Sequence, residues 1–167
     1  MCIRDRHLAG YASTKQDVQE FISQLVPLLE SRMPAGVDDP QTLRDRSWWK
    51  GPDIFLVVDD YDLVATSSGN PLQGLLELLP YGRDIGLHMV VARRCTGFSR
   101  TSFEPIMARL RELHPTIFLM SGTAEEGIIA GGRKARSLSK GRADVISNQG
   151  THQAVSYTHL TLPTTPY

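Results

Sequence analysis

Three carboxylates that follow one short apolar segment are the residues whose type and spacing could do chemistry. Residues 54–58 are Ile-Phe-Leu-Val-Val, and they are followed by Asp59, Asp60 and, after one tyrosine, Asp62. A continuous apolar run of this length predicts a strand that is buried on both faces. Carboxylates at the end of such a strand can hold a hard cation such as magnesium, orient a water molecule, or cap the next turn. Asp62 is expected to face solvent or to cap the following turn.

An apolar strand that ends in Asp plus a second carboxylate has the form of a Walker B element. In P-loop nucleotidases this Asp holds magnesium, often through water, and a neighbouring residue orients the attacking water. The pattern therefore predicts Asp59 as the magnesium-associated residue, through water, and Asp60 as the catalytic carboxylate. Capping of the loop or of the next helix by these side chains is the structural alternative. A phosphorelay receiver would need a further Asp and a Lys at later strand ends, and the segments VVARRC and IFLMSG do not supply them.

The loop that cradles phosphates in such enzymes does not occur in this sequence. The pattern G-x-x-x-x-G-K-[ST] is found nowhere in the chain. Without the backbone N–H groups and the Lys of that loop, the phosphates have no cradle. We expect ATP and magnesium to bind to the complete domain and not tightly to this chain alone. We also expect the loss of the loop's strand and helix to leave an apolar edge and face of the sheet exposed.

Hydrophobic periodicity predicts alternating helices and strands. An amphipathic helix is expected over 13–33, with Thr14 and Asp17 as its cap and with Pro27 kinking or splitting it. Asn70 and Pro71 should start another helical segment. This alternation predicts an α/β fold with a mostly parallel sheet, helices on both faces, and ligands at the carboxyl ends of the strands. The remaining predicted segments are strands at 87–92, 117–120 and 143–147, and helices at 103–113 and 123–129.

Length and composition limit the class of protein. The chain has 167 residues, enough for one domain, and 18 basic residues balance 18 acidic ones. This balance gives no support for nucleic-acid binding, and no apolar run approaches the roughly 20 residues of a membrane span. The two cysteines are too few for a disulfide framework or a zinc site, so a reducing cytosolic setting fits best.

Both ends of the chain differ from the sequence beside them. Residues 1–6, MCIRDR, and residues 156–167, SYTHLTLPTTPY, have the appearance of translated adaptor sequence and are predicted to be non-native. The natural part would then be residues 7–155, the C-terminal part of one domain. Ordinary disordered termini are the alternative.

Four segments together resemble one family. They are RSWWKGPDIFLVVDDYDLV, LLPYGRDIGLHMVVARR, FEPIMARLREL and LMSGTAEEG, and they are similar to the C-terminal FtsK/SpoIIIE-type ATPase domain of EccC, the motor of actinobacterial type VII secretion. The resemblance covers residues 7–154. It implies a partial P-loop NTPase fold of the FtsK/RecA-like kind, beginning after the Walker A loop.

The resemblance also implies roles for individual residues. Asp60 stands where active FtsK-like domains carry a catalytic Glu, so its carboxylate reaches about 1.5 Å less far. A misplacement of this size can cost about a hundredfold in rate, which favours weak hydrolysis. Arg93 matches the position of a polar sensor for the γ-phosphate and is expected to bind the nucleotide. Thr116 lies where such domains often carry a trans-acting Arg, so Arg chemistry toward a neighbouring subunit is doubtful.

Two functions are therefore open at this stage. The first is an ATP-binding part of a secretion motor that energises or gates protein export, in contact with neighbouring ATPase domains or subunits. The second is a non-catalytic module that recognises the C-terminal signal of secreted substrates. Both imply a cytoplasmic protein at the inner face of the cell membrane, in a secretion complex. The parent protein is expected to be an ATPase, and this chain alone to be inactive.

Overall fold

The computed structural model describes residues 8–34, 36, 39–66, 68–98 and 103–156. Residues 1–6 and 157–167, for which adaptor sequence is expected, lie outside this part. The chain forms two compact units, Met1–Arg93 and Arg94–Tyr167. The expectation of one domain over residues 7–155 stays a prediction. In the described part, no helix has the length and apolar character needed to cross a membrane.

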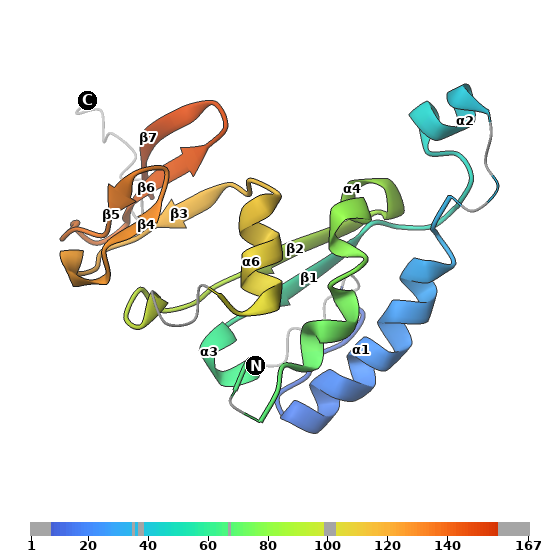
Figure 1. The fold of residues 1–167 in the computed structure, drawn as a ribbon, viewed down its shortest axis with the longest axis horizontal. Coiled ribbons are helices and arrows are strands. Elements are labelled where there is room, and N and C mark those ends of the chain that lie inside the picture. Colours follow the sequence, from blue (N-terminus) through green and yellow to red (C-terminus); the bar gives the residue numbers. More distant parts are fainter. Residues whose placement is uncertain (1–7, 35, 37–38, 67, 99–102, 157–167) are drawn as a thin grey trace, which may run out of the picture. The chain divides into compact units, whose positions relative to one another are not determined.

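The first unit combines two parallel strands with short helices (Figure 1). Strands β1 (Ile54–Val58) and β2 (Leu87–Val91) pair in parallel, with Val58 opposite Val91. The carboxyl ends of both strands therefore meet at one edge, as the sequence predicts. The helical segments of this unit are α1 (Lys15–Glu30), α2 (Pro40–Asp45), α3 (Tyr61–Val64), η1 (Pro71–Leu75), η2 (Leu79–Tyr81) and α4 (Gly82–Ile85).

Helix α1 begins with the predicted cap. The hydroxyl of Thr14 accepts the Asp17 N–H at 3.1 Å, and the Asp17 carboxylate accepts the Thr14 N–H at 3.0 Å. Pro27 does not split the helix, because the chain remains helical on both sides and Ser31 N–H donates to the Pro27 carbonyl at 3.0 Å. One stripe of the helix is buried, and it consists of Ile22, Leu25 and Leu29.

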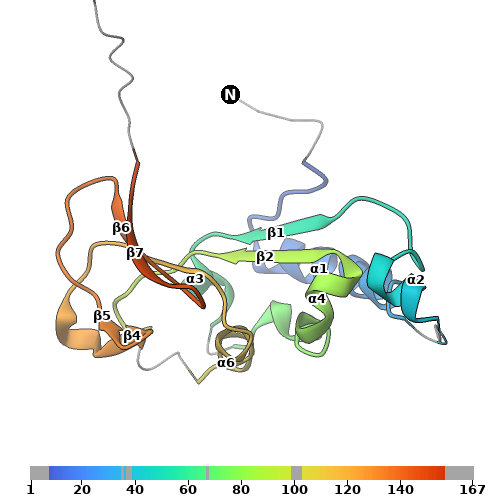
Figure 2. The same ribbon diagram turned by 90° about the horizontal axis from the view of Figure 1, so that it is seen from above.

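Only one face of the β1–β2 pair is covered, so the prediction of a strand buried on both faces is wrong. Val58 and Leu87 are buried, whereas Phe55 and Val57 are each 68% exposed. Figure 2 shows α4 on one side of the two strands. Since side chains alternate across a strand, the residues that point to the other side remain open. Phe55, Val57 and Val90 thereby form an exposed apolar face of the two strands.

A buried arginine joins the end of α1 to the start of β1. The guanidinium of Arg32 donates to the Ile85 carbonyl at 3.1 Å and to the Pro52 carbonyl at 3.2 Å, and it lies 4.2 Å from the ring centroid of Trp49. Trp48 Nε1–H donates to the Arg32 carbonyl at 2.7 Å. The sequence predicts one packed and one partly exposed tryptophan, but both are half-buried. Their indole rings hold this junction.

The second unit contains antiparallel strands. Strands β3, β6 and β7 form one sheet in the order β3–β6–β7, and β4 pairs with β5. Parallel pairing among the described residues is thus confined to β1 and β2. The helix predicted over 123–129 stops early, because residues from Ile128 onward form a strand. The elements are α6 (Pro105–Glu112), β3 (Ile117–Leu119), η3 (Ala124–Glu126), β4 (Ile128–Ala130), β5 (Arg133–Lys134), β6 (Arg142–Ser147) and β7 (Gly150–Val155).

A bidentate ion pair supports strand β6. Arg136 donates through Nε and Nη2 to the two carboxylate oxygens of Asp144, at 3.0 and 2.8 Å, and Asp144 is buried. The hydrogen bond from Arg136 lowers the pKa of the Asp144 carboxyl below its ordinary value of 3.8, against the opposing effect of burial. The core beside this strand consists of Phe98, Leu119, Ile129, Ala135 and Ile146, with Cys95 packed against it.

This ion pair should make the stability of the chain depend on pH. Because the folded pKa of Asp144 lies below the unfolded one, the stabilisation is fully present above the unfolded pKa. It is lost as the pH falls through the folded value. We expect Asp144→Asn to remove this part of the acid sensitivity, measured by urea unfolding between about pH 3 and pH 7. Glu77→Gln, at an exposed position, is the control. Equal acid sensitivity in wild type and Asp144→Asn would contradict the assignment.

Candidate functional site

The acidic turn, residues 59–62, follows β1 directly and is fixed against the end of β2. Ala92 N–H donates to the Val58 carbonyl at 2.8 Å, and Tyr61 N–H donates to the Ala92 carbonyl at 3.0 Å. These two bonds hold the segment after β2 beside the turn after β1. The parallel pairing therefore brings the predicted site residues Asp59, Asp60 and Arg93 to one edge, the edge where ligands of parallel sheets bind.

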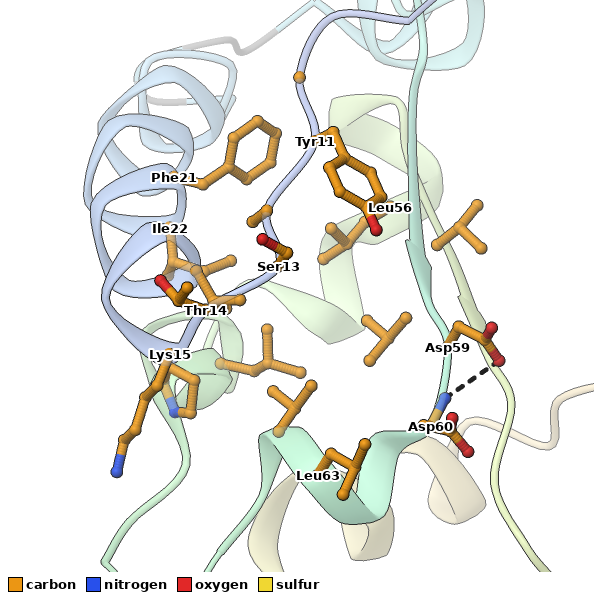
Figure 3. Close-up of a pocket in the computed structure, with 18 of the residues that line it drawn as sticks. Tyr11, Ser13, Thr14, Lys15, Phe21, Ile22, Leu56, Asp59, Asp60 and Leu63 are labelled. Atoms are coloured by element: carbon orange, nitrogen blue, oxygen red, sulfur yellow. Dashed lines mark hydrogen bonds between the residues drawn. The ribbon is translucent and has the colours of Figure 1, made fainter. Parts of the chain in front are cut away.

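The carboxylates of Asp59 and Asp60 are exposed, and the backbone of Asp60 has an uncommon conformation. Asp60 has φ 47° and ψ 56°, in the left-handed region, and its N–H donates to the Asp59 Oδ1 at 3.0 Å (Figure 3). Aspartate adopts this region more readily than most residues, because its short polar side chain can bond locally. Asp60 occupies the N-cap position of α3 but makes no side-chain capping bond. The capping alternative therefore does not account for its carboxylate.

Asp62 forms an ion pair, so the prediction that it faces solvent is wrong, and capping of the following turn stays a prediction. Its Oδ1 accepts a hydrogen bond from Arg93 Nη2 at 2.9 Å, and both side chains are mostly buried. The physical reason is the parallel register of the strands. It brings the residue that follows β2 next to the first turn of α3, although 31 positions separate the two in sequence. A contact of Arg93 with nucleotide stays a prediction.

A hollow of about 580 Å³ lies in the first unit along β1 and extends to the acidic turn. Figure 3 shows Phe21 from α1, Tyr11 from the preceding segment and Leu56 from β1 around it, with the two carboxylates at one end. Tyr11 and Phe21 were not predicted as lining residues of a site. The apolar run of β1 gave no signal for the hollow, because every one of its five residues is apolar.

The residues present fit part of a magnesium–nucleotide site. An exposed carboxylate such as Asp59 is a hard oxygen donor and suits water-mediated magnesium binding. In the described part of the chain, no group of three His, Cys, Asp or Glu side chains could hold a metal ion by itself. The sequence also lacks the phosphate-binding loop, so the described residues could supply one carboxylate edge of such a site but not the cradle for the phosphates.

Because His88 lies inside a predicted apolar strand, the sequence predicts a buried core histidine, and this prediction is wrong. Its side chain is 41% exposed, its Nε2 lies 3.1 Å from the Asp53 carboxylate, and its ring stacks on Phe55 with centroids 4.6 Å apart. The reason is that His88 pairs with Phe55 in the register of the sheet and lies on its uncovered face. Cys95 is half-buried beside the core of the second unit, as a small loop hydrophobe should be.

Comparison with known proteins gives consistent results, although no protein-family model matches the chain. The chain is 50% identical to the ESX-4 secretion system protein EccC4 of Mycobacterium tuberculosis over 153 residues, which are 92% of this chain and 12% of that protein. The structure resembles the cytoplasmic domain of the Thermomonospora curvata type VII secretion ATPase EccC, with a TM-score of 0.88 and 40% identity. This match covers 93% of the present chain and 18% of the solved one.

A second solved structure shows ATPases 2 and 3 of the same Thermomonospora curvata protein in complex with a signal sequence peptide. It also matches with a TM-score of 0.88 and 40% identity, over 93% of this chain and 28% of that one. The predicted α/β, P-loop NTPase-like fold is therefore confirmed. The chain spans about an eighth of the length of the curated relative described above.

Proposed function

Because the chain belongs to the EccC family of type VII secretion ATPases, we propose that it forms the Walker B part of a nucleotide site in a C-terminal FtsK/SpoIIIE-type ATPase domain. The domain would act in the cytoplasm, at the inner face of the membrane, beside neighbouring ATPase domains or subunits. It would energise or gate protein export. The observation that carries this proposal is the exposed Asp59–Asp60 pair at the carboxyl end of β1, beside the parallel strand β2.

The two carboxylates have separate roles in this proposal. Magnesium, when bound with ATP, neutralises charge on the phosphates. Asp59 would hold the magnesium ion through water, and its Oδ1 accepts a hydrogen bond from the Asp60 N–H at 3.0 Å. Asp60 would orient the attacking water, but its side chain is one methylene shorter than that of glutamate and would reach less far. The complete domain should therefore bind nucleotide and hydrolyse it slowly.

Asp59→Asn tests the proposal in the complete EccC-type protein. We expect the affinity for ATP in the presence of magnesium to fall at least about tenfold, because losing a group that orients metal ligands weakens metal binding by that order. The measurement is a titration with a fluorescent ATP analogue, with and without magnesium. Asp45→Asn, exposed on α2, is the matched control and should not change the affinity. An unchanged magnesium dependence in Asp59→Asn would overturn the assigned role of Asp59.

A second candidate function is recognition of the C-terminal signal of secreted substrates. It is favoured by the similar EccC structure, which holds a signal sequence peptide. Titration of wild type and Asp59→Asn with a labelled substrate C-terminal peptide distinguishes signal recognition from nucleotide binding. Recognition predicts equal peptide binding by both proteins, and no binding by either would rule it out.

A further inference from the structure

We infer that Asp62 and Arg93 are positioning residues, which hold the acidic turn so that the Asp59 and Asp60 carboxylates keep their direction. This inference rests on the proposed function, since it concerns the same nucleotide site. It departs from the sequence-based expectation that Arg93 reaches the γ-phosphate. It also gives Asp62 a role that its place in the sequence does not suggest.

The ion pair is well placed to act on the turn. Asp62 lies in the first turn of α3, two residues after Asp60, and its partner Arg93 lies two residues after the end of β2. The Arg93 side chain is only 9% exposed and that of Asp62 is 21% exposed. Water and salt screen such a pair much less than a surface pair, so it fixes geometry better than an exposed ion pair does.

Other contacts fix the surroundings of the turn. Tyr61, between the acidic residues, is buried; its N–H donates to the Ala92 carbonyl, and its hydroxyl accepts a hydrogen bond from Asn70 Nδ2 at 2.8 Å. The backbone at Asp60 is in the left-handed region, which costs energy for a residue with a side chain and persists only when neighbouring contacts maintain it. The ion pair of Asp62, two residues later, fixes the backbone on the C-terminal side of Asp60.

The burial of Arg93 argues against direct contact with phosphate. A guanidinium that is nearly inaccessible and pairs with a carboxylate at 2.9 Å would have to break that pair to reach a nucleotide. The carboxylate left behind would then be partly buried without its charge partner, which is costly. The geometry therefore favours an Arg93 that acts through Asp62 on the acidic turn.

The test uses three variants of the complete EccC-type protein: Asp62→Asn, Arg93→Met and the double variant. Two quantities are measured. The first is the affinity for ATP in the absence of magnesium, and the second is the magnesium concentration at which half of the magnesium-dependent increase in ATP affinity is reached. If the pair positions the turn, each single variant should raise that magnesium concentration about tenfold. The affinity without magnesium should stay unchanged. The double variant should equal either single one, because both remove the same interaction.

Two further variants distinguish a positioning role of Arg93 from direct phosphate binding and from a folding defect. Arg93→Lys retains the charge and should recover part of the magnesium response, which also keeps the test valid if Arg93→Met does not fold. Arg83→Met, exposed on α4, is the control. If Arg93→Met weakens ATP binding without magnesium while Asp62→Asn does not, Arg93 is a phosphate ligand and the inference is wrong. Unchanged magnesium responses also overturn it. Wild-type protein that binds no ATP would instead refute the proposed function, and the inference with it.

Discussion

Replacing Asp60 with glutamate is expected to raise the ATP turnover of the complete EccC-type protein by up to about a hundredfold. The extra methylene would extend the carboxylate by about 1.5 Å toward the position that the catalytic Glu takes in active FtsK-like domains. The group that orients the attacking water would then lie closer to it. The measurement is steady-state phosphate release with saturating ATP and magnesium. Turnover no faster than that of wild type, in a variant that binds ATP equally well, would contradict the proposed role of Asp60.

The backbone conformation at residue 60 is less favourable for glutamate than for aspartate. Asp60 has a left-handed conformation, which aspartate tolerates better than glutamate, so part of the gain can be lost to strain. Asp60→Asn is the matched variant, since asparagine suits the same conformation but carries no charge. We expect it to show no gain and to lose the residual turnover. This conformation also gives a structural reason for an aspartate here, apart from catalysis.

Replacing Arg32 with alanine is expected to lower the free energy of unfolding of the chain by about 3 kcal/mol, because two carbonyls lose a charged donor that is itself buried. Those carbonyls belong to Ile85 and Pro52, and the stacking of the guanidinium on Trp49 is lost as well. The measurement is urea unfolding of the chain, followed by tryptophan fluorescence, which reports on the same junction.

Two variants place bounds on this effect. Arg32→Lys keeps a charge but cannot serve both carbonyls and stack on the ring at once, so we expect an intermediate loss. Arg44→Ala, exposed on α2, should change the free energy of unfolding by less than about 0.5 kcal/mol. A loss in Arg32→Ala as small as that in Arg44→Ala would show that the junction does not stabilise the fold.

Local sequence signals predicted the elements that depend on local contacts. Thr14 and Asp17 are three residues apart and cap α1 by bonds that any isolated helix could form. Asn70 and Pro71 start η1 in the same way, with the Asn70 side chain accepting the Leu72 N–H. The segment 54–58 was identified as a strand from its apolar run. The same run could not indicate which face would be covered, because that depends on elements elsewhere in the chain.

The placement of Asp59 and Asp60 at the end of a strand was predicted from the sequence itself, because the apolar run stops where the acidic residues begin. Only the tertiary structure decided how the acidic turn is held. The Asp62–Arg93 pair spans 31 positions and the Arg32–Ile85 contact spans 53, and no periodicity in a sequence encodes such separations. The left-handed backbone at Asp60 likewise follows from the contacts around it, because an aspartate permits that conformation without requiring it.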